Sequence, residues 1–449
     1  MKILNPATGA VLADVPESAP ASLDPLIRAQ QVWAVRPLAD RLDVIRSFRS
    51  LLIDRKEKLA QILTSEVGKP IAQSRSEIDG TLGRIDFFLE QVPKVLQDAV
   101  VHQEPKLEER ISLEPLGLLL NISAWNYPYY VGSNVFLPAL LTGNALLYKP
   151  SEYATLTGLA IGDLLRDAGL PEHLFTVCVG GGEVGVQLLK QRIDGVYFTG
   201  SYGTGKKIAE AVAGRMIRVQ LELGGKDPVY ICDDVDVQAA AEATADGAFY
   251  NTGQSCCAVE RLYVHRKVYA EFVDAFQKTV RGFKAGDPTD AATYIGPLAR
   301  AAQLGILEGQ VADAIDKGAR LLCGGKRMTG PGNYFEPTVL ADARHDMKVM
   351  RDESFGPIIG IMPAYDDLQA RELMKDTEYG LTAGVYTKDR ARAERILSAI
   401  KTGTAYWNCC DRVSPRLPWS GRGHSGIGST LSTYGIQTFL QPKAWHFRG

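Results

Sequence analysis

The sequence predicts an α/β protein in which parallel sheets are covered by helices. From Leu116 onward, short apolar runs alternate with helical patterns, and each run ends in a turn. This spacing is typical of strands buried in a parallel, doubly wound sheet. The chain has 449 residues, of which 45% are hydrophobic and 23% are charged, so it can bury a large core and divide into two or three domains.

Composition excludes several kinds of partner. A formal net charge of −2 gives no reason to expect a nucleic-acid partner. The most apolar region, 116–148, is interrupted by Asn and Pro long before it reaches the roughly 18 apolar residues of a membrane helix, so no membrane partner is expected. The apolar run at the start, "MKILNPATG", is too short for the hydrophobic region of a signal peptide, and we expect a cytoplasmic protein.

The cysteines and histidines predict reduced thiols rather than a metal site. The seven cysteines form no CxxC pair, and the six histidines lie away from them. A tetrahedral zinc site is therefore not expected. An odd cysteine count in a long chain without a secretion signal also speaks against a disulfide framework.

The first third of the chain is expected to be helical. Between Arg41 and Lys69, apolar residues recur at helical spacing, and the pattern stops at "VGKP", where Gly68 and Pro70 are terminators. The charged stretch 101–115 alternates weakly and suits an exposed hairpin. Five buried strands are then expected, with helices between them: "LGLLLNIS", "NALLYKPSE", "LFTVCVGGG", "DGVYFTGS" and "IRVQLELGG".

A second α/β region is expected from about Gly225. Its strands are predicted at "DPVYICD", "RLYVHR", "LLCGG", "IIGIMPAY", "AGVYTKD" and "GTAYWN". The tail "TYGIQTFLQPKAWHFRG" alternates again and ends in aromatic residues. Exposed strands need partners, so the tail and the early hairpin are candidates for oligomer contacts.

Two glycine-rich turns compete as a dinucleotide site. "VGGGEVG" contains a literal G-x-G-x-x-G, at Gly180, Gly182 and Gly185, between a strand and a helix. "FTGSYGTG" is a second strand–turn–helix, with glycines at 200, 203 and 205. Each is equally well explained as a tight turn, so neither settles the cofactor by itself.

Polar residues at strand ends are candidates for a site. Asn126 in "SAWNYP" is either a turn residue or an amide donor facing a cleft. Lys149 and Glu152 lie just past a strand's carboxyl end, where open α/β sheets bind ligands, although a surface pair is the simpler interpretation. Glu222 lies within an apolar strand, where burial of a carboxylate raises its pKa and suits it to act as a general base.

The stretch "FYNTGQSCCAVER" places two cysteines side by side. The residues alone leave open whether Cys256 or Cys257 is a nucleophile or whether both are small core residues. If the segment is extended, adjacent side chains point in opposite directions, so only one sulfur faces a substrate.

Eight motifs in order resemble the NAD(P)-dependent aldehyde dehydrogenase superfamily: "WNYP", "KPSE", "FTGS-x-x-x-G", "LELGGK", "NTGQSCCA", "DESFGP", "YGLTAGVYT" and "PWSGRGHSGIG". The resemblance runs from "NPATG" at Asn5 to the carboxyl end. It implies a Rossmann-like dinucleotide-binding domain (1–98 and 117–224), an α/β catalytic domain (225–429) and a small β oligomerisation arm (99–116 and 430–449). It also implies a homodimer or homotetramer.

The resemblance implies a role for each reacting residue. Cys256, the second residue after Gln254 in G-Q-x-C, would attack an aldehyde. Asn126 and the Cys256 backbone N–H would form the oxyanion hole, and Glu222 would activate the water that hydrolyses the thioester to a carboxylic acid. The cofactor would be NAD, with NADP as a poorer alternative. A thiol hydrolase would need no dinucleotide loop, and a CoA-acylating relative typically lacks the base.

The resemblance also implies binding residues. Those expected at the cofactor are Ser123, Trp125, Lys149, Ser151, Glu152, Gly182, Gly200, Ser201, Gly205, Leu223, Gly224, Glu353 and Phe355. Those expected at the substrate are Tyr130, Tyr250, Ser255, Cys257, Arg412 and Trp419. Arg412 suggests a substrate with a carboxylate, the aromatic residues suggest an apolar one, and a surface pair with Asp411 is the simpler role for Arg412. Thr430 falls where many relatives carry Glu, which puts a proton-relay role there in doubt.

Overall fold

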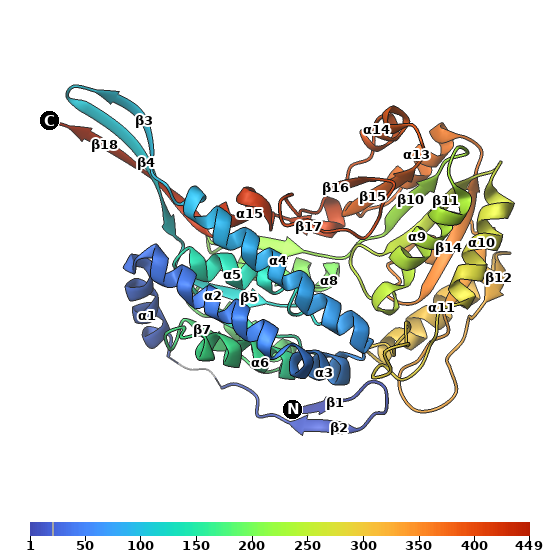
Figure 1. Ribbon diagram of the computed structural model, residues 1–449, viewed down its shortest axis with the longest axis horizontal. Coiled ribbons are helices and arrows are strands. Elements are labelled where there is room, and N and C mark those ends of the chain that lie inside the picture. Colours follow the sequence, from blue (N-terminus) through green and yellow to red (C-terminus); the bar gives the residue numbers. More distant parts are fainter. Residues whose placement is uncertain (20–21) are drawn as a thin grey trace.

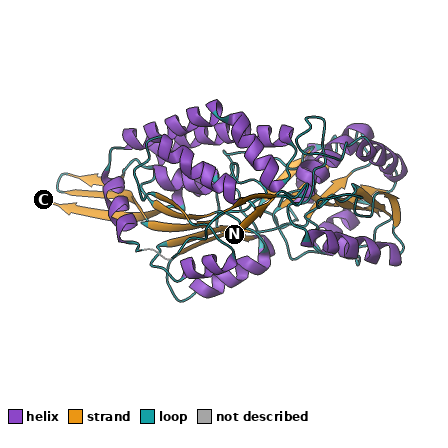
Figure 2. Ribbon diagram, turned by 90° about the horizontal axis from the view of Figure 1, so that it is seen from below, coloured by secondary structure: helices purple, strands orange, loops and turns teal. Residues whose placement is uncertain are grey.

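The structure is a computed structural model that describes residues 1–19 and 22–449. These residues form two α/β bodies side by side, and a narrow three-stranded arm projects from the first body (Figure 1). Helices lie on both faces of the sheets (Figure 2). The predicted α/β fold class is confirmed.

The first body contains a six-stranded sheet in the order β17-β9-β8-β5-β6-β7. All five strands predicted for this region are present and parallel, and the short β17 joins β9 antiparallel. The bounds are β5 Leu118–Ile122, β6 Ala145–Lys149, β7 Phe175–Val177, β8 Gly195–Thr199, β9 Arg218–Glu222 and β17 Gly426–Ile427. Every residue of β5 and β6 is buried, as their continuous apolar sequences predict.

Helices cover this sheet, and four of them are the crossovers between its parallel strands. They are α1 Asp24–Val35, α2 Leu38–Asp54, α3 Lys56–Val67, α4 Ile71–Val95, α5 Ser133–Leu141, α6 Thr155–Asp167, α7 Gly182–Leu189, α8 Tyr202–Val212 and α15 Ser432–Gln437. The helical pattern between Arg41 and Lys69 is divided in two at Arg55. Its predicted end is confirmed, because Gly68 caps α3 in the left-handed region with φ 82°.

The second body contains a seven-stranded sheet in the order β12-β13-β14-β11-β10-β15-β16. It includes all six predicted strands and one that the sequence analysis missed, β13. The strand bounds are β10 Asp227–Ile231, β11 Val259–His265, β12 Arg320–Cys323, β13 Thr338–Ala341, β14 Ile358–Ala364, β15 Thr382–Tyr386 and β16 Thr404–Trp407. The helices are α9 Val237–Phe249, α10 Tyr269–Arg281, α11 Ala302–Asp316, α12 Lys348–Arg351, α13 Asp367–Lys375 and α14 Arg390–Leu397, with 3₁₀ turns η1 Tyr250–Gly253 and η2 Gly423–Ser425.

The arm combines the predicted hairpin with the tail. β3 Ala99–Glu104, β4 Leu107–Pro115 and β18 Leu440–Arg448 pair in the order β18-β4-β3. The tail therefore finds its strand partner within the chain, along the whole length of β4. β3 is left as an outer edge with Val100 and Val101 exposed, which is the surface on which a further strand can pair.

The connections place several predicted site residues between the two bodies. β9 ends at Glu222, and the chain continues directly into β10 of the second sheet. η1 precedes the cysteine pair and β11, while β17 returns the chain to β9. A separate two-stranded sheet, β1 Lys2–Leu4 with β2 Val11–Asp14, lies near the N-terminus. None of the described helices is both long and apolar enough to cross a membrane.

Candidate active site

The cysteine pair lies in a tight turn, not in the extended segment that the sequence analysis assumed. Asn251 and Thr252 adopt positive φ (54° and 59°), and Gly253 does so at 70°. A Cβ at Gly253 would lie 2.3 Å from the Gly356 carbonyl oxygen, so only glycine fits there. The turn closes with a hydrogen bond from Ala258 N to Ser255 O of 3.2 Å. The two thiols therefore differ in the groups that they contact, and not because they point to opposite faces of a strand.

The two thiols have different surroundings. Cys257 is buried, and its Sγ donates a hydrogen bond to Asp411 Oδ1 at 3.0 Å. The neighbouring Cys256 thiol, burial and the Asp411 carboxylate all raise the pKa of Cys257. Cys257 is therefore held as a neutral thiol, whereas Cys256 is partly exposed. This arrangement favours Cys256 as the reactive sulfur, and the assignment stays a prediction.

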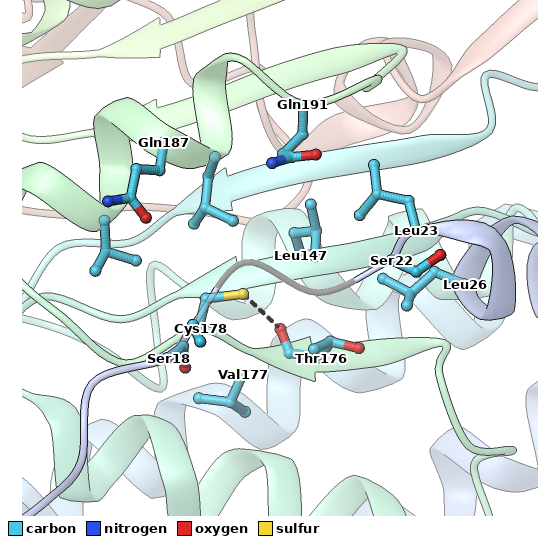
Figure 3. Close-up of a pocket in the computed structure, with 13 residues that line it drawn as sticks. Ser18, Ser22, Leu23, Leu26, Leu147, Thr176, Val177, Cys178, Gln187 and Gln191 are labelled. Carbon is cyan, nitrogen blue, oxygen red and sulfur yellow. Dashed lines mark hydrogen bonds between the residues drawn. The ribbon is translucent and has the colours of Figure 1, made fainter.

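A second buried cysteine lies beside a cavity in the first body (Figure 3). The cavity measures about 280 Å³ and is lined mainly by apolar side chains such as Leu23, Leu147 and Val177. Cys178 donates its thiol hydrogen to Thr176 O at 3.7 Å, and burial raises its pKa to about 11. A thiol with so high a pKa is a poor nucleophile at neutral pH.

Asn126 lies in the turn after β5 and is bonded to the loop that carries Cys256. Its buried Nδ2 donates to Gln254 O at 3.1 Å. Asn251 Nδ2 donates to the same carbonyl at 3.0 Å and to Asn126 O at 3.3 Å. Two segments about 130 residues apart are thereby joined next to the cysteine pair. A primary amide has a second N–H, which leaves Asn126 a donor for a substrate oxygen.

A buried ion pair that the sequence analysis missed holds the Asn126 turn. Lys69 pairs with Glu77 of α4 and donates to Asn126 O at 2.7 Å. Glu77 in turn accepts from the backbone N–H groups of Tyr129 (2.9 Å) and Tyr130 (3.2 Å). The "VGKP" segment was predicted only to end a helix. A lysine at an otherwise buried helix end was the available signal.

Glu222 is buried at the end of β9. Its Oε1 accepts hydrogen bonds from the Thr430 hydroxyl and from Gln220 Nε2 at 3.3 Å. Burial raises the pKa of Glu222 to about 7, while the Thr430 hydroxyl and the Arg84 guanidinium oppose that rise. The carboxyl group therefore changes its protonation state near neutral pH, as a general base requires. Thr430, whose role was in doubt, directly contacts this carboxylate.

Lys149 is a buried cation with unused donors. Lys149 is 3% exposed, and burial lowers its pKa while Glu152 opposes the shift. Among the described residues, its Nζ donates a hydrogen bond to Pro150 O at 3.2 Å. Ser151 Oγ donates to the Glu152 carboxylate at 3.3 Å, and Glu152 is exposed. An ammonium with donors to spare beside an exposed carboxylate fits the hydroxyl groups of a ribose.

The glycine-rich turns begin two helices of the first body. Gly182 opens α7 and Ser201 precedes α8, so both turns present helix N-termini, which favour anions such as a pyrophosphate. A Cβ at Gly205 would lie 2.5 Å from the Leu223 side chain. The absence of a side chain at Gly205 therefore lets α8 pack closely against the residue that follows β9. Gly200 N donates to the backbone oxygen of Glu222 at 3.0 Å.

A second buried ion pair, also missed, anchors the "ESFGP" loop. Glu260 pairs with Lys226 and accepts from the backbone N–H groups of Ser354 and Phe355 at 2.8 to 3.1 Å. Glu353 lies against the backbone of the Leu223–Gly225 turn and accepts from Gly225 N at 3.0 Å. Burial raises the pKa of Glu353 to about 8.

The aromatic cofactor candidates lie together. The Phe355 and Trp125 rings meet edge to face with centroids 5.5 Å apart. Ser123, which directly follows β5, is buried and donates its N–H to Lys149 O at 3.0 Å. These residues and those of the preceding paragraphs supply the donor, carboxylate and aromatic groups that a dinucleotide needs.

Four of the predicted substrate residues make the following contacts. Tyr130 donates its hydroxyl to Val413 O at 3.4 Å, Tyr250 meets Tyr294 edge to face at 6.4 Å, and Ser255 lies 3.5 Å from the Asp411 carboxylate. Trp419 is buried and pairs through its backbone with Thr430. Tyr130 and Ser255 thus contact the loop 409–416, and Trp419 follows it in the chain.

Arg412 does not form the ion pair with Asp411 that was its simpler interpretation. Among the described residues, the exposed guanidinium donates a hydrogen bond to the backbone oxygen of Asp411, at 3.4 Å. The Asp411 carboxylate instead points to the thiol of Cys257, and burial raises its pKa to about 6. The Arg412 charge opposes that rise in the pKa of Asp411 without forming an ion pair with it.

The fold and site together define a class of protein, an α/β enzyme with a thiol in a loop between two sheets. The family model for the aldehyde dehydrogenase family matches residues 1–445. The chain belongs to this family, whose members are NAD(P)-dependent oxidoreductases.

Three relatives show how far the likeness extends. The succinate-semialdehyde dehydrogenase [NADP(+)] of Deinococcus radiodurans is 34% identical over 445 residues, which cover 98% of this chain and 93% of the relative. The structure of lactaldehyde dehydrogenase from Escherichia coli superposes with a TM-score of 0.96 at 31% identity, over 100% of this chain and 96% of the other. A Staphylococcus aureus betaine aldehyde dehydrogenase in complex with NAD+ gives a TM-score of 0.94 at 30% identity, over 100% and 94%.

Proposed function

We propose that this enzyme oxidises an aldehyde to the carboxylic acid with NAD, through a thioester on Cys256. The observation that carries the proposal is the bond of the Asn126 amide to the loop of the partly exposed Cys256. The buried Glu222 carboxylate supplies the base. The test is aldehyde-dependent NADH formation without CoA, run across a panel of aldehydes.

The mechanism follows from the chemistry of these side chains. The Cys256 sulfur bonds to the carbonyl carbon, and the carbonyl oxygen becomes an oxyanion that accepts from Asn126 and from the Cys256 backbone N–H. The oxyanion then re-forms the carbonyl as the C–H bond breaks, which leaves a thioester on Cys256. Bound NAD would supply the acceptor for this hydride. Glu222 then takes a proton from water, the water oxygen bonds to the thioester carbon, and the sulfur leaves as a thiolate.

The residues present fit the dinucleotide that this reaction requires. Lys149 and Glu152 would hold the adenosine ribose, and the α8 N-terminus at Ser201 would face the pyrophosphate. Glu353 and Phe355 would hold the nicotinamide ribose. The support for this assignment is the buried ammonium of Lys149 with donors to spare, together with the buried ion pair that fixes the loop of Phe355.

We propose NAD preference on the basis of Glu152. The 2′-phosphate of NADP would face this carboxylate, and two such charges about 4 Å apart repel by about 4 kcal/mol at an effective dielectric of 20. Even a third of that repulsion favours NAD by about tenfold. The relatives include one named for NADP(+) and one bound to NAD+, so the choice depends on this chain's own residues.

Glu152→Gln is expected to reduce or reverse the preference for NAD. The measurement compares kcat/KM for NAD and NADP in the wild type and the variant. Glu172→Gln, another exposed carboxylate of the first body, is the matched control and should change neither value. A wild-type preference for NADP would contradict the placement of Glu152.

Arg412→Ala is expected to lower the turnover of succinic semialdehyde relative to benzaldehyde by roughly fivefold, the effect of losing one exposed charge contact. The reason is that Arg412 carries an exposed positive charge on the loop near the cysteine pair. Arg416→Ala, on the same loop and also exposed, is the control. An unchanged ratio in Arg412→Ala would remove the anion site from the proposal and leave the aromatic residues as the guide to the substrate.

We also propose a homodimer or homotetramer that assembles through the arm. The exposed edge strand β3, with Val100 and Val101, supports this assembly. Light scattering of the full chain and of a chain with charged residues at these two valines tests it. The cytoplasmic location expected from the sequence is tested by cell fractionation.

A further inference from the structure

Thr430 is a buried side chain whose hydroxyl has a defined partner. It is 0% exposed, and its Oγ1 donates to Glu222 Oε1. Gln220 Nε2 donates to the same oxygen at 3.3 Å. A carboxylate accepts two such bonds best when it is ionised, so both donors favour the charged form of Glu222.

The backbone holds this hydroxyl in place. Thr430 and Trp419 exchange two hydrogen bonds, Trp419 N to Thr430 O at 2.8 Å and Thr430 N to Trp419 O at 2.9 Å. A few residues earlier, β17 pairs with β9, and Leu223 N donates to Ser425 O at 3.2 Å. The segment that carries Thr430 is thus tied to the strand that carries Glu222, although the two residues are 208 positions apart.

One charged group in the described structure acts on Glu222 alongside these neutral donors. Arg84 of α4 is fully buried, with its guanidinium 3.3 Å from the centre of the Tyr130 ring and bonded to Asn134 and to Tyr130 O. Its positive charge favours the ionised form of Glu222 but makes no hydrogen bond to it. Gln220 lies on β9 itself. Thr430 is therefore the donor that the carboxyl-terminal segment contributes.

We propose that Thr430 is a positioning residue for the general base, holding the Glu222 carboxylate at the end of β9 and stabilising its ionised form. This inference rests on the proposed role of Glu222. The proton that Glu222 removes comes from water, and Thr430 keeps its own proton throughout. The hydroxyl therefore sets the pH range in which deacylation runs, without itself transferring a proton.

The test is the pH dependence of kcat from about pH 5.5 to about pH 9.5. Thr430→Val keeps the shape of the side chain and removes the donor, so the acidic limb should move upward by about one pH unit, the usual effect of one hydrogen bond to a charged group. The rate then falls about tenfold near pH 6 and by less than about twofold near pH 9. Thr430→Ser restores the donor and should return the limb to its wild-type position. Thr430→Ala, which cannot clash, should behave like Thr430→Val.

The controls separate this inference from the proposed function. Thr244→Val removes a buried hydroxyl of α9 that donates to the backbone oxygens of Ala240 and Ala241, and it should leave the acidic limb unchanged. No shift in Thr430→Val and Thr430→Ala, or an equal shift in Thr430→Ser, overturns the role of the hydroxyl while leaving Glu222 as the base. If the acidic limb of the pH profile persists in Glu222→Gln, the roles of both Thr430 and Glu222 are overturned, because the titrating group is then another residue.

Discussion

Cys256→Ala is expected to abolish aldehyde oxidation, with a loss of at least about a thousandfold, whereas Cys257→Ala should retain a substantial fraction of the activity. The reason is the difference between the two environments. Cys257 is buried and donates its thiol hydrogen to Asp411, which holds it in the neutral form. Cys256 is partly exposed in the loop bonded to Asn126. Steady-state NADH formation with each variant measures the effect.

Two further measurements sharpen this comparison. Cys178→Ala removes a buried thiol that lies beside a separate cavity, and it should leave activity unchanged. Alkylation by iodoacetamide followed by mass spectrometry should label Cys256 first. If Cys257→Ala were the inactive variant and Cys256→Ala the active one, the register of the active-site loop would be wrong.

Glu222→Gln is expected to separate the two halves of the reaction. The variant keeps the nucleophile and the oxyanion donors but lacks the base, so one turnover should give a burst of NADH and then stall at the thioester. The steady-state rate should fall by at least about a hundredfold, the usual contribution of a general base. Rapid-mixing measurements of the burst and of the steady state check both parts. Equal losses in burst and steady state would mean that Glu222 chiefly activates Cys256.

The pH dependence gives an independent check on Glu222. Burial raises its pKa to about 7, and only the ionised form accepts a proton, so kcat should rise with pH through about 7 and level off above it. Glu66 is another buried carboxyl group with a pKa raised to about 7, and it bonds the backbone of α6 far along the chain from β9. Glu66→Gln should keep the acidic limb, and Glu222→Gln should lose it.

Local sequence patterns predicted much of the architecture. The continuous apolar strings that became β5 and β6 and the terminator at Gly68 are visible in the chain because burial and helix ends leave short-range signals. The strand β13, Thr338–Ala341, was missed in the sequence. The break between α2 and α3 was missed because the apolar spacing continues across Arg55.

The sequence by itself determined the α/β class, most of the strands and the identity of the motif residues, including Cys256, Glu222 and Asn126. Only the tertiary structure decided what surrounds each of them. Cys257 reaches Asp411 across 154 positions and Glu222 meets Thr430 across 208. Lys69, in the loop between α3 and α4, pairs with Glu77 of α4, and both support the Asn126 turn. No local pattern encodes such contacts, because each depends on how complete strands and helices pack. Burial in that packed interior, rather than residue type, sets the pKa values on which the chemistry depends.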